Sequence, residues 1–392
     1  MRRYTDEEEL RLRLQRSVKN WTRSGLLLPD QAAQLEADLR VDLRRTGIML
    51  RLGLALFTTI LAGATVLLTW VSLGISGDSG TGILSLLFGV VCFWAADALV
   101  ARFRLYHYGV EEALVVSSVG LCGVGVALIA NTLFHFHNST AMALALAAAA
   151  AVSGYVFQRL GLQYAGAAGI VCAALIPFSF DGVSEPVRRA LVALLFGGAV
   201  AGAAAAAGRN RSEVRREAAF TLRAAALVCM YLVVNLEISG VSSVFGYGRA
   251  VDTWFKWTTY ALIWFIPTLA LWRGVVSRER KLMLAGLATA LATLVTNKPY
   301  LGLPRQTWDP MLFGLLLMAV AVILRRWLAS GPGGERHGFT AARILHTDVD
   351  MVRLAGLASA AIHLNTDRPA PAPSQPQFGG GRSGGGGAGA DF

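Results

Sequence analysis

Hydrophobic and polar positions alternate in long blocks along this chain. Ten predominantly apolar segments stand out, at residues 52–75, 82–101, 113–134, 139–157, 162–180, 188–207, 218–238, 258–273, 281–296 and 310–328. A helix needs about 20 apolar residues to cross a hydrocarbon core of about 30 Å, because unpaired backbone groups are costly there. The pattern predicts an all-α fold, a polytopic transmembrane bundle of about ten spans. The eighth and ninth segments are short, so the sequence alone allows eight to ten.

A small polar module precedes the first span and has helical spacing on both sides of a short turn. Two apolar stripes recur at helical intervals, one of Leu10, Leu14, Val18 and Trp21 and one of Ala32, Leu35, Leu39 and Leu43. Pro29 suits the first turn of the second helix. We predict an αα-hairpin over residues 1–48, with Trp21 packed between its helices.

The rest of the chain divides by composition. We expect a transmembrane helical domain over residues 49–330, then a linker over residues 331–366 whose second part has amphipathic spacing. Residues 367–392 are rich in Pro and Gly, and a segment of that composition cannot bury enough apolar surface to order itself. A disordered tail is therefore predicted at that end.

Composition and charge support a membrane environment. The chain of 392 residues is 54% hydrophobic and only 16% charged, and it carries a net charge of +11. Most Lys and Arg residues lie in segments that alternate with segments poor in Lys and Arg, as the positive-inside rule requires. The exceptions are Arg188, Arg189, Arg249, Lys256, Lys298 and Arg305, which fall in segments expected outside, and Arg223, within the seventh span.

This distribution predicts a multi-pass protein of the cytoplasmic (inner) membrane, with the N- and C-termini in the cytoplasm. Membrane lipids are the expected partners, and the N-terminal hairpin offers a place for protein partners. Because the positive charge is spread through short loops between apolar runs, no nucleic-acid partner is expected. The sequence does not determine the oligomeric state.

Two ionisable residues lie within predicted spans. Asp97 and Arg223 are both near the inner ends of their segments, where a charge within the bilayer costs free energy unless it is compensated. One hypothesis is that they form a buried ion pair that fixes helix packing or lines a solute path. The alternative is that each side chain reaches the cytoplasmic interface by itself.

A second group of polar residues is expected at the outer face. Its members close the third span, follow the fifth, end the seventh or precede the eighth: Asn131, His135, His137, Asp181, Glu185, Asn235, Glu237 and Lys256. Such residues could bind a solute or a lipid headgroup, and Asn131, His135, Glu237 and Lys256 join Asp97 and Arg223 as candidate substrate-binding residues. Ordinary loop polarity at the water boundary is the alternative.

No catalytic motif is recognisable, and we expect no catalytic residue, metal or cofactor. Two histidines two positions apart point in different directions on a helix, and the cysteines lie singly in apolar runs: Cys92, Cys122, Cys172 and Cys229. Small residues are dense in the spans, for example Gly198 and Gly202, Gly166 and Gly169, and Gly120, Gly123 and Gly125. Such residues let membrane helices approach closely.

A resemblance to a known family is confined to the N-terminal module and the general architecture. Trp21-x3-Gly25-Leu26-Leu27, then Pro29-Asp30-Gln31 and Leu35-Glu36-Ala37-Asp38, followed directly by a polytopic membrane domain, resemble the bacterial membrane proteins with domain of unknown function 2157. The resemblance implies a membrane location and this architecture, and it brings no known activity.

Three classes of function remain open at this stage. The first is a carrier for a small solute or lipid, built from two inverted five-helix repeats. The second is a membrane scaffold or sensor that recruits partners through the hairpin and the tail. The third is a membrane enzyme that acts at the outer face, although the absence of catalytic motifs does not favour it.

Overall fold

The computed structural model describes residues 3–23, 26–180, 182–210, 212–239, 253–301, 306, 309–331, 335–336 and 339–340. Nearly all of these residues are helical, which confirms the all-α prediction. The strands among the described residues are two short antiparallel ones, β1 (Glu335–Arg336) and β2 (Phe339–Thr340). The predicted amphipathic segment beyond Thr340 and the predicted tail lie outside the described residues.

Helices occur in each of the apolar segments. They are α3 (Ile48–Ser72), α4 (Asp78–Phe103), α5 (Val110–Thr132), α6 (Asn138–Leu160), α7 (Gln163–Leu175) with the 3-10 turn η1 (Ile176–Ser179), α8 (Glu185–Arg209), α9 (Glu213–Val234), α11 (Thr253–Ser277), α12 (Arg280–Tyr300) and α13 (Asp309–Ala329). A four-residue helix, α10 (Leu236–Ser239), follows α9. Within the described residues, α3, α4, α5, α6, α8, α9 and α11 are long and apolar enough to cross a membrane.

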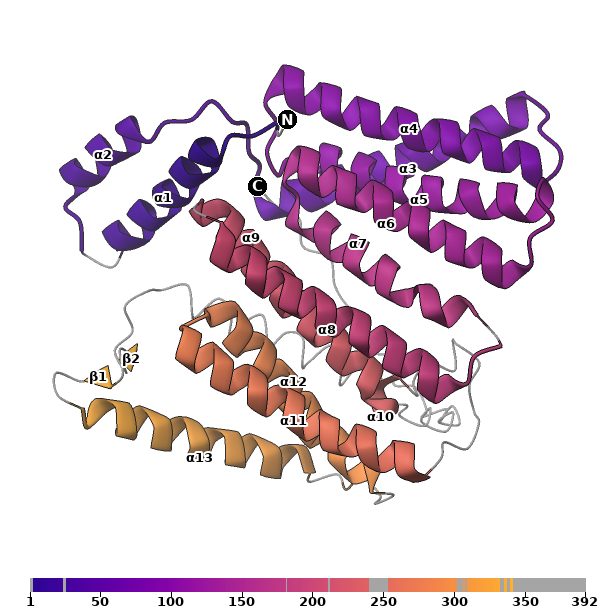
Figure 1. The fold of residues 1–392 in the computed structure, drawn as a ribbon. Helices are drawn as coiled ribbons and strands as arrows, with labels where there is room; N and C mark the ends of the chain where they lie inside the picture. Colours follow the sequence, from indigo (N-terminus) through magenta and orange to yellow (C-terminus); the bar gives the residue numbers. More distant parts are fainter. Residues whose placement is uncertain are drawn as a thin grey trace, which may run out of the picture.

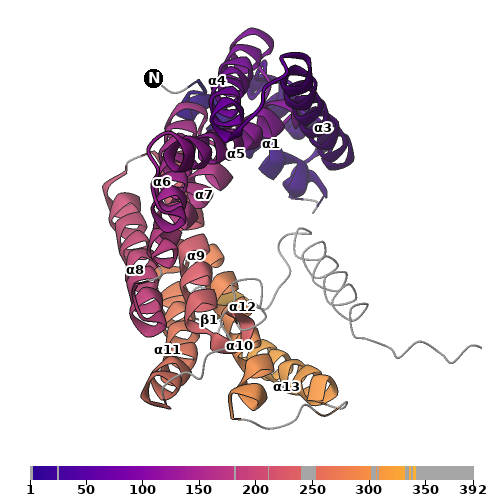
Figure 2. The same cartoon turned by 90° about the vertical axis from the view of Figure 1, so that its right-hand side faces the viewer.

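The helices are arranged in chain order along an arc. Figure 2 shows α3 and α4 at one end of the arc and α11 to α13 at the other, with α8 and α9 between them. Consecutive helices pack in antiparallel pairs, above all α4 with α5, α8 with α9, and α11 with α12. Buried apolar side chains form one cluster among α4 to α7 and another among α9, α11 and α12.

Small residues explain only part of this packing. A side chain at Gly125 would collide with Leu86 and Gly82 of α4, and Gly169 touches the backbone of α6 at Ala150. These two positions confirm close approach between helices. Gly198 and Gly202 of α8 have no neighbouring atoms within 4 Å of an added side chain, so the prediction that they mediate packing is wrong.

The N-terminal hairpin is present and lies beside one end of the bundle (Figure 1). It consists of α1 (Asp6–Arg23) and α2 (Pro29–Asp38), and Pro29 begins the second helix as predicted. Trp21 is 38% exposed, so it is not buried between the helices. The prediction packs the apolar stripe of α1 against the second helix alone, whereas α1 contacts both α2 and α9. Val18 of that stripe is buried, and so is Leu12, which lies outside the stripe.

Candidate functional site at the hairpin end of the bundle

Polar contacts concentrate where the N-terminal segment meets the bundle. Residues Arg3 to Arg13 contact the last turns of α4 and α6, the loop after α4 and the first turns of α9. We call this set the docking site. It comprises Arg3, Tyr4, Asp6, Glu8 and Arg13 from the N-terminal segment and Asp97, Arg104, Leu105, Arg159, Arg215 and Glu217 from the bundle.

Asp97 is the centre of the docking site. Its Oδ1 accepts a hydrogen bond from Arg3 Nε at 2.7 Å and another from Arg159 Nε at 3.2 Å. A second nitrogen of each guanidinium group faces Oδ2, and the Asp97 side chain is only 13% exposed. The Arg3 amide also donates to the Arg159 carbonyl at 2.9 Å, and this bond holds the N-terminal segment beside α6. One carboxylate on α4 thus holds the N-terminal segment and α6 together.

The hypothesis that Asp97 pairs with Arg223 is wrong. Arg223 on α9 instead contacts Glu279, just before α12, with Nη1 2.8 Å from Oε1 and 3.1 Å from Oε2. The sequence indicated that Asp97 and Arg223 have similar depths along their helices, and depth does not determine which helices are neighbours. Arg223 therefore joins α9 to α12 and has no part in the docking site.

Tyr4 anchors the segment by a buried side chain. It is 4% exposed, its hydroxyl donates to the Leu105 carbonyl, and its ring meets the edge of Tyr106 with centroids 5.1 Å apart. Burial raises the pKa of Tyr4, with further contributions from nearby carboxylates. The hydroxyl is therefore protonated at neutral pH, as its role of donor requires.

Glu8 combines helix capping with docking. The Thr5 amide donates to Glu8 Oε2 at 3.0 Å and the Glu8 amide donates to Thr5 Oγ1 at 3.2 Å, a reciprocal capping box at the start of α1. The other carboxylate oxygen accepts from Arg104 in the loop after α4. Burial alone would raise the pKa of Glu8, but the hydrogen bonds from Thr5 and Arg104 outweigh it and hold that pKa below its ordinary value.

Ion pairs on the other flank join α1 to α9 and α12. Arg215 Nε lies 3.1 Å from Asp6 Oδ2, and Arg13 pairs with Glu217. Glu217 also accepts from Lys281 Nζ of α12 at 2.9 Å. The hairpin is thus connected to four helices of the bundle, α4, α6, α9 and, through Glu217, α12.

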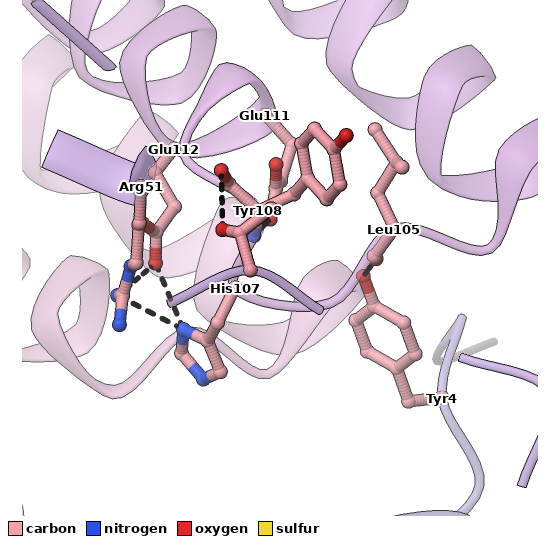
Figure 3. Close-up of polar contacts among 8 residues, drawn as sticks. Tyr4, Arg51, Leu105, His107, Tyr108, Glu111 and Glu112 are labelled. Carbon is pink, nitrogen blue, oxygen red and sulfur yellow. Dashed lines mark hydrogen bonds and ion pairs between the residues drawn. The ribbon is translucent and has the colours of Figure 1, made fainter. Parts of the chain in front are cut away.

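A second polar cluster lies between α3 and α5 at the same end of the bundle (Figure 3). Arg51 Nε donates to Glu112 Oε2 at 2.6 Å, and His107 Nδ1 lies 2.8 Å from Glu112 Oε1 and 3.1 Å from Arg51 Nη2. A single ring nitrogen can serve only one of these two neighbours at a time. We call Arg51, His107, Glu111 and Glu112 the loop cluster, and it fixes the start of α3 against the start of α5.

Glu111 is the least exposed member of the loop cluster. Its side chain is 1% exposed, and Oε1 accepts the Tyr108 amide at 2.7 Å. Its Oε2 has no hydrogen-bond partner among the described atoms. Sequence reasoning missed this cluster, although two adjacent carboxylates in the first turn of an apolar helix were a signal for it.

The candidate residues expected at the outer face are not brought together. Asn131 and His135 are exposed at the end of α5, and Lys256 is exposed on α11. Glu237 lies on α10, and these four side chains share no hydrogen bond or ion pair within the described structure. Asp181, which belonged to the same prediction, lies outside the described residues.

Asn235 of that group has a structural role instead. It is fully buried, and its amide donates to Tyr231 Oη at 2.8 Å and to Thr296 Oγ1 at 2.9 Å. Its Oδ1 accepts the backbone amides of Glu237 and Ile238. Every polar atom of the side chain has a partner, so this network joins α9 to α12 and caps the start of α10.

The described residues contain no group of three or more His, Cys, Asp and Glu side chains arranged to hold a metal ion. The docking site consists mainly of ion pairs between the N-terminal segment and helix ends. What the arrangement can do is hold the hairpin against the bundle or release it.

Long apolar helices in this number are compatible with a multi-pass α-helical membrane protein, which is the class that the fold defines. Comparisons with protein-family models, curated proteins and solved structures each found no match to this chain. The resemblance of the hairpin to domain of unknown function 2157 therefore stays a prediction.

Proposed function

We propose that this protein is a scaffold or sensor of the cytoplasmic membrane with about ten spans, both termini in the cytoplasm, and a hairpin that recruits protein partners. The observation that carries the proposal is the position of Asp97. The carboxylate expected to serve a solute path is occupied by Arg3 and Arg159, and it holds the hairpin to the bundle.

The position of the docking site agrees with the distribution of Arg and Lys residues, and this agreement supports a cytoplasmic location of the hairpin. The ends of α4 and α6 and the start of α9 meet the N-terminal segment, and Arg and Lys residues concentrate there and at the neighbouring start of α12. Positive segments remain on the cytoplasmic side during insertion. The same side therefore carries the hairpin.

The surface of the hairpin supports partner binding. Five large apolar side chains are more than one third exposed on it: Leu14, Trp21, Leu26, Leu28 and Leu35. Apolar side chains grouped on a small polar module are typical of interaction surfaces, and aromatic residues are enriched in them. The pockets described among the helices are lined mainly by apolar residues, and none of them includes Asp97, Arg223 or Asn131, as a carrier would require.

Site-specific photo-cross-linking in cells tests the proposal. A photoreactive residue at Leu28, which is 65% exposed on the hairpin, should form an adduct of one discrete mass with a protein that can be identified by mass spectrometry. The same residue at Leu68, which is 68% exposed on the apolar helix α3, is the matched control and should give no protein adduct.

Release of the hairpin should change the yield of that adduct. Asp97→Asn removes the carboxylate between Arg3 and Arg159, so the adduct from Leu28 should change at least twofold. Asp78→Asn, at the opposite end of α4, should leave it unchanged. The proposal would be overturned if Leu28 gave no protein adduct, or if purified protein lacking the hairpin transported a solute in proteoliposomes.

A further inference from the structure

An open pocket of about 440 Å³ lies between α6, α8 and α9 near the hairpin. Its walls are apolar and small, formed mainly by Ala203 and Ala206 of α8 and by Ala218, Ala219 and Leu222 of α9. Because these alanine side chains are small, a narrow apolar slot remains between α8 and α9. Its polar lining residues are Gln158, Asn210 and Arg215.

The position of the pocket along the helices matches the boundary between headgroups and acyl chains. Ala203 lies six residues before Arg209, the last residue of α8, which is about 9 Å along a helix. Arg215 lies in the first turn of α9, and both helix ends are at the hairpin end of the bundle. The apolar part of the slot therefore faces the membrane interior and its polar part faces the membrane surface.

The charges at the mouth of the pocket are predominantly positive. Arg215 lines the pocket with a side chain that is 58% exposed, and Arg209 and Arg216 lie near it in the sequence, at the end of α8 and the start of α9. Three acidic residues lie near Arg215: Asp6, which pairs with it at 3.1 Å, Glu213, at the first position of α9, and Glu217, which is already paired with Arg13 and Lys281. A negatively charged headgroup complements this mouth, and an acyl chain complements the alanine slot.

We propose that this pocket binds an anionic phospholipid of the surrounding leaflet, with an acyl chain between α8 and α9 and the phosphate at Arg215. Arg215 is also the partner of Asp6, at 3.1 Å, in an exposed and therefore weak ion pair. A phosphate and Asp6 compete for the same guanidinium group. Bound lipid consequently loosens one of the contacts that hold the hairpin, a consequence that rests on the proposed sensor function.

Lipid retention tests the pocket itself. The purified full-length protein is reconstituted in nanodiscs of equal parts phosphatidylglycerol and phosphatidylethanolamine, and the lipids that remain bound are counted by native mass spectrometry. The wild type should retain phosphatidylglycerol preferentially. Arg215→Gln should reduce that preference about fivefold, the effect of one basic residue near an anionic surface.

Filling the slot should act differently from removing the charge. Ala206→Phe should abolish retention of either lipid, and Ala206→Leu is a smaller filling variant in case the larger one does not fold. Arg102→Gln, an equal charge change at an exposed position on the end of α4, is the control and should retain lipid as the wild type does. Equal retention of both lipids by the wild type, or a preference unchanged in Arg215→Gln and Ala206→Leu, would overturn the proposal.

Hydrogen exchange distinguishes a failure of the lipid proposal from a failure of the proposed function. Amides of α1 should exchange faster in phosphatidylglycerol nanodiscs than in phosphatidylethanolamine nanodiscs, and this difference should disappear in Arg215→Gln. Selective lipid retention without any change at α1 would overturn the competition with Asp6. Failure of the hairpin to recruit a protein would overturn the proposed function and would not alter the lipid counts.

Discussion

At the scale of single residues, Asp97 shows how a carboxylate is accommodated in an apolar helix. An uncompensated acidic side chain within a bilayer costs about 2.5–3.5 kcal/mol on insertion scales. Here two guanidinium groups, Arg3 from the N-terminal segment and Arg159 from α6, share one carboxylate. Removing either arginine leaves one partner, whereas removing Asp97 leaves two like charges facing each other. The carboxylate is therefore the most sensitive member of the docking site.

Glu8 makes docking depend on pH. Its pKa is below the ordinary value of about 4.3 in the folded protein, so it stabilises the docked hairpin above that value, and this stability is lost as pH falls through the folded pKa. Because Arg104 is 43% exposed, the contribution is about 1 kcal/mol or less. Relative to the intrinsic exchange rate, we expect the hydrogen exchange of α1 amides to become faster as pH falls from 7 to 3.

The variant Glu8→Gln separates this effect from the titration of other carboxylates. It should exchange faster than the wild type at pH 7, and its rate should change less with pH, after correction for the intrinsic exchange rate. Glu7→Gln is the control, since Glu7 is 71% exposed and pairs only with Arg11 in its own helix among the described contacts. Equal pH dependence in Glu8→Gln and the wild type would contradict the prediction.

Gly109 is required at the start of α5 by its backbone conformation. Its φ of 107° lies in a region that is essentially restricted to glycine, and a side chain there would collide with the Arg51 carbonyl. Gly109→Ala should destabilise the protein by about 1–3 kcal/mol and move the start of α5 away from the start of α3. The thermal midpoint of the detergent-solubilised protein measures this.

Gly120, in the middle of α5, provides the matched comparison. An added side chain at Gly120 meets no atom within 4 Å, so Gly120→Ala should be neutral or slightly stabilising. If both alanine variants melted at the temperature of the wild type, the close approach of Gly109 to Arg51 would be wrong.

At the scale of elements, α9, α11 and α12 are joined by hydroxyl and amide groups. Tyr231 Oη lies 2.9 Å from Thr293 Oγ1, which itself donates to the Ile263 carbonyl of α11 at 2.7 Å. Without water to drive association, hydrogen bonds between membrane helices contribute about 0.6 kcal/mol on average and up to about 1.7 kcal/mol. A network of several such bonds stabilises the C-terminal half of the bundle.

Asn235→Ala tests this network. It removes the amide that bonds to Tyr231 and Thr296 and the oxygen that accepts two amides of α10, so we expect a loss of about 1–2 kcal/mol. Thermal unfolding in detergent should show a lower midpoint. Asn138→Ala, at an exposed position in the first turn of α6, should melt as the wild type does. An unchanged midpoint in Asn235→Ala would show that the network adds no stability.

The helices could be predicted because each apolar run determines its own element locally. The partners of polar residues could not, because they depend on which helices become neighbours. Arg3 and Asp97 are 94 positions apart, and no local spacing connects them. The same limit explains why Arg223 pairs with Glu279 and not with Asp97, and why Asn235, expected at the outer face, is fully buried beside α12.

At the scale of the whole molecule, the docking site constrains how the chain crosses the membrane. The N-terminal segment contacts Arg159 at the end of α6 and also Arg215 and Glu217 at the start of α9, so these two helix ends lie on the same side. Between them the chain passes through α7 with η1 and then through α8, a helix of 25 residues that is long enough to cross. If α8 crosses, an even number of crossings is needed between the two helix ends, so we predict that α7 with η1 also crosses.

This requirement is notable because α7 and η1 are short. Thirteen α-helical and four 3-10 residues extend over about 28 Å, slightly less than the hydrocarbon core of about 30 Å. We predict that α7 with η1 spans the membrane, with the bilayer thinned locally or the flanking polar residues drawn to its surface.

Reporter fusions measure whether this segment crosses. Alkaline phosphatase is active only outside the cytoplasm, and green fluorescent protein is fluorescent inside it. Fluorescence is expected after Gly161 and after Asn210, and phosphatase activity after Ser184. An inactive phosphatase after Ser184 would mean that α7 does not cross, which is incompatible with the N-terminal segment contacting both α6 and α9.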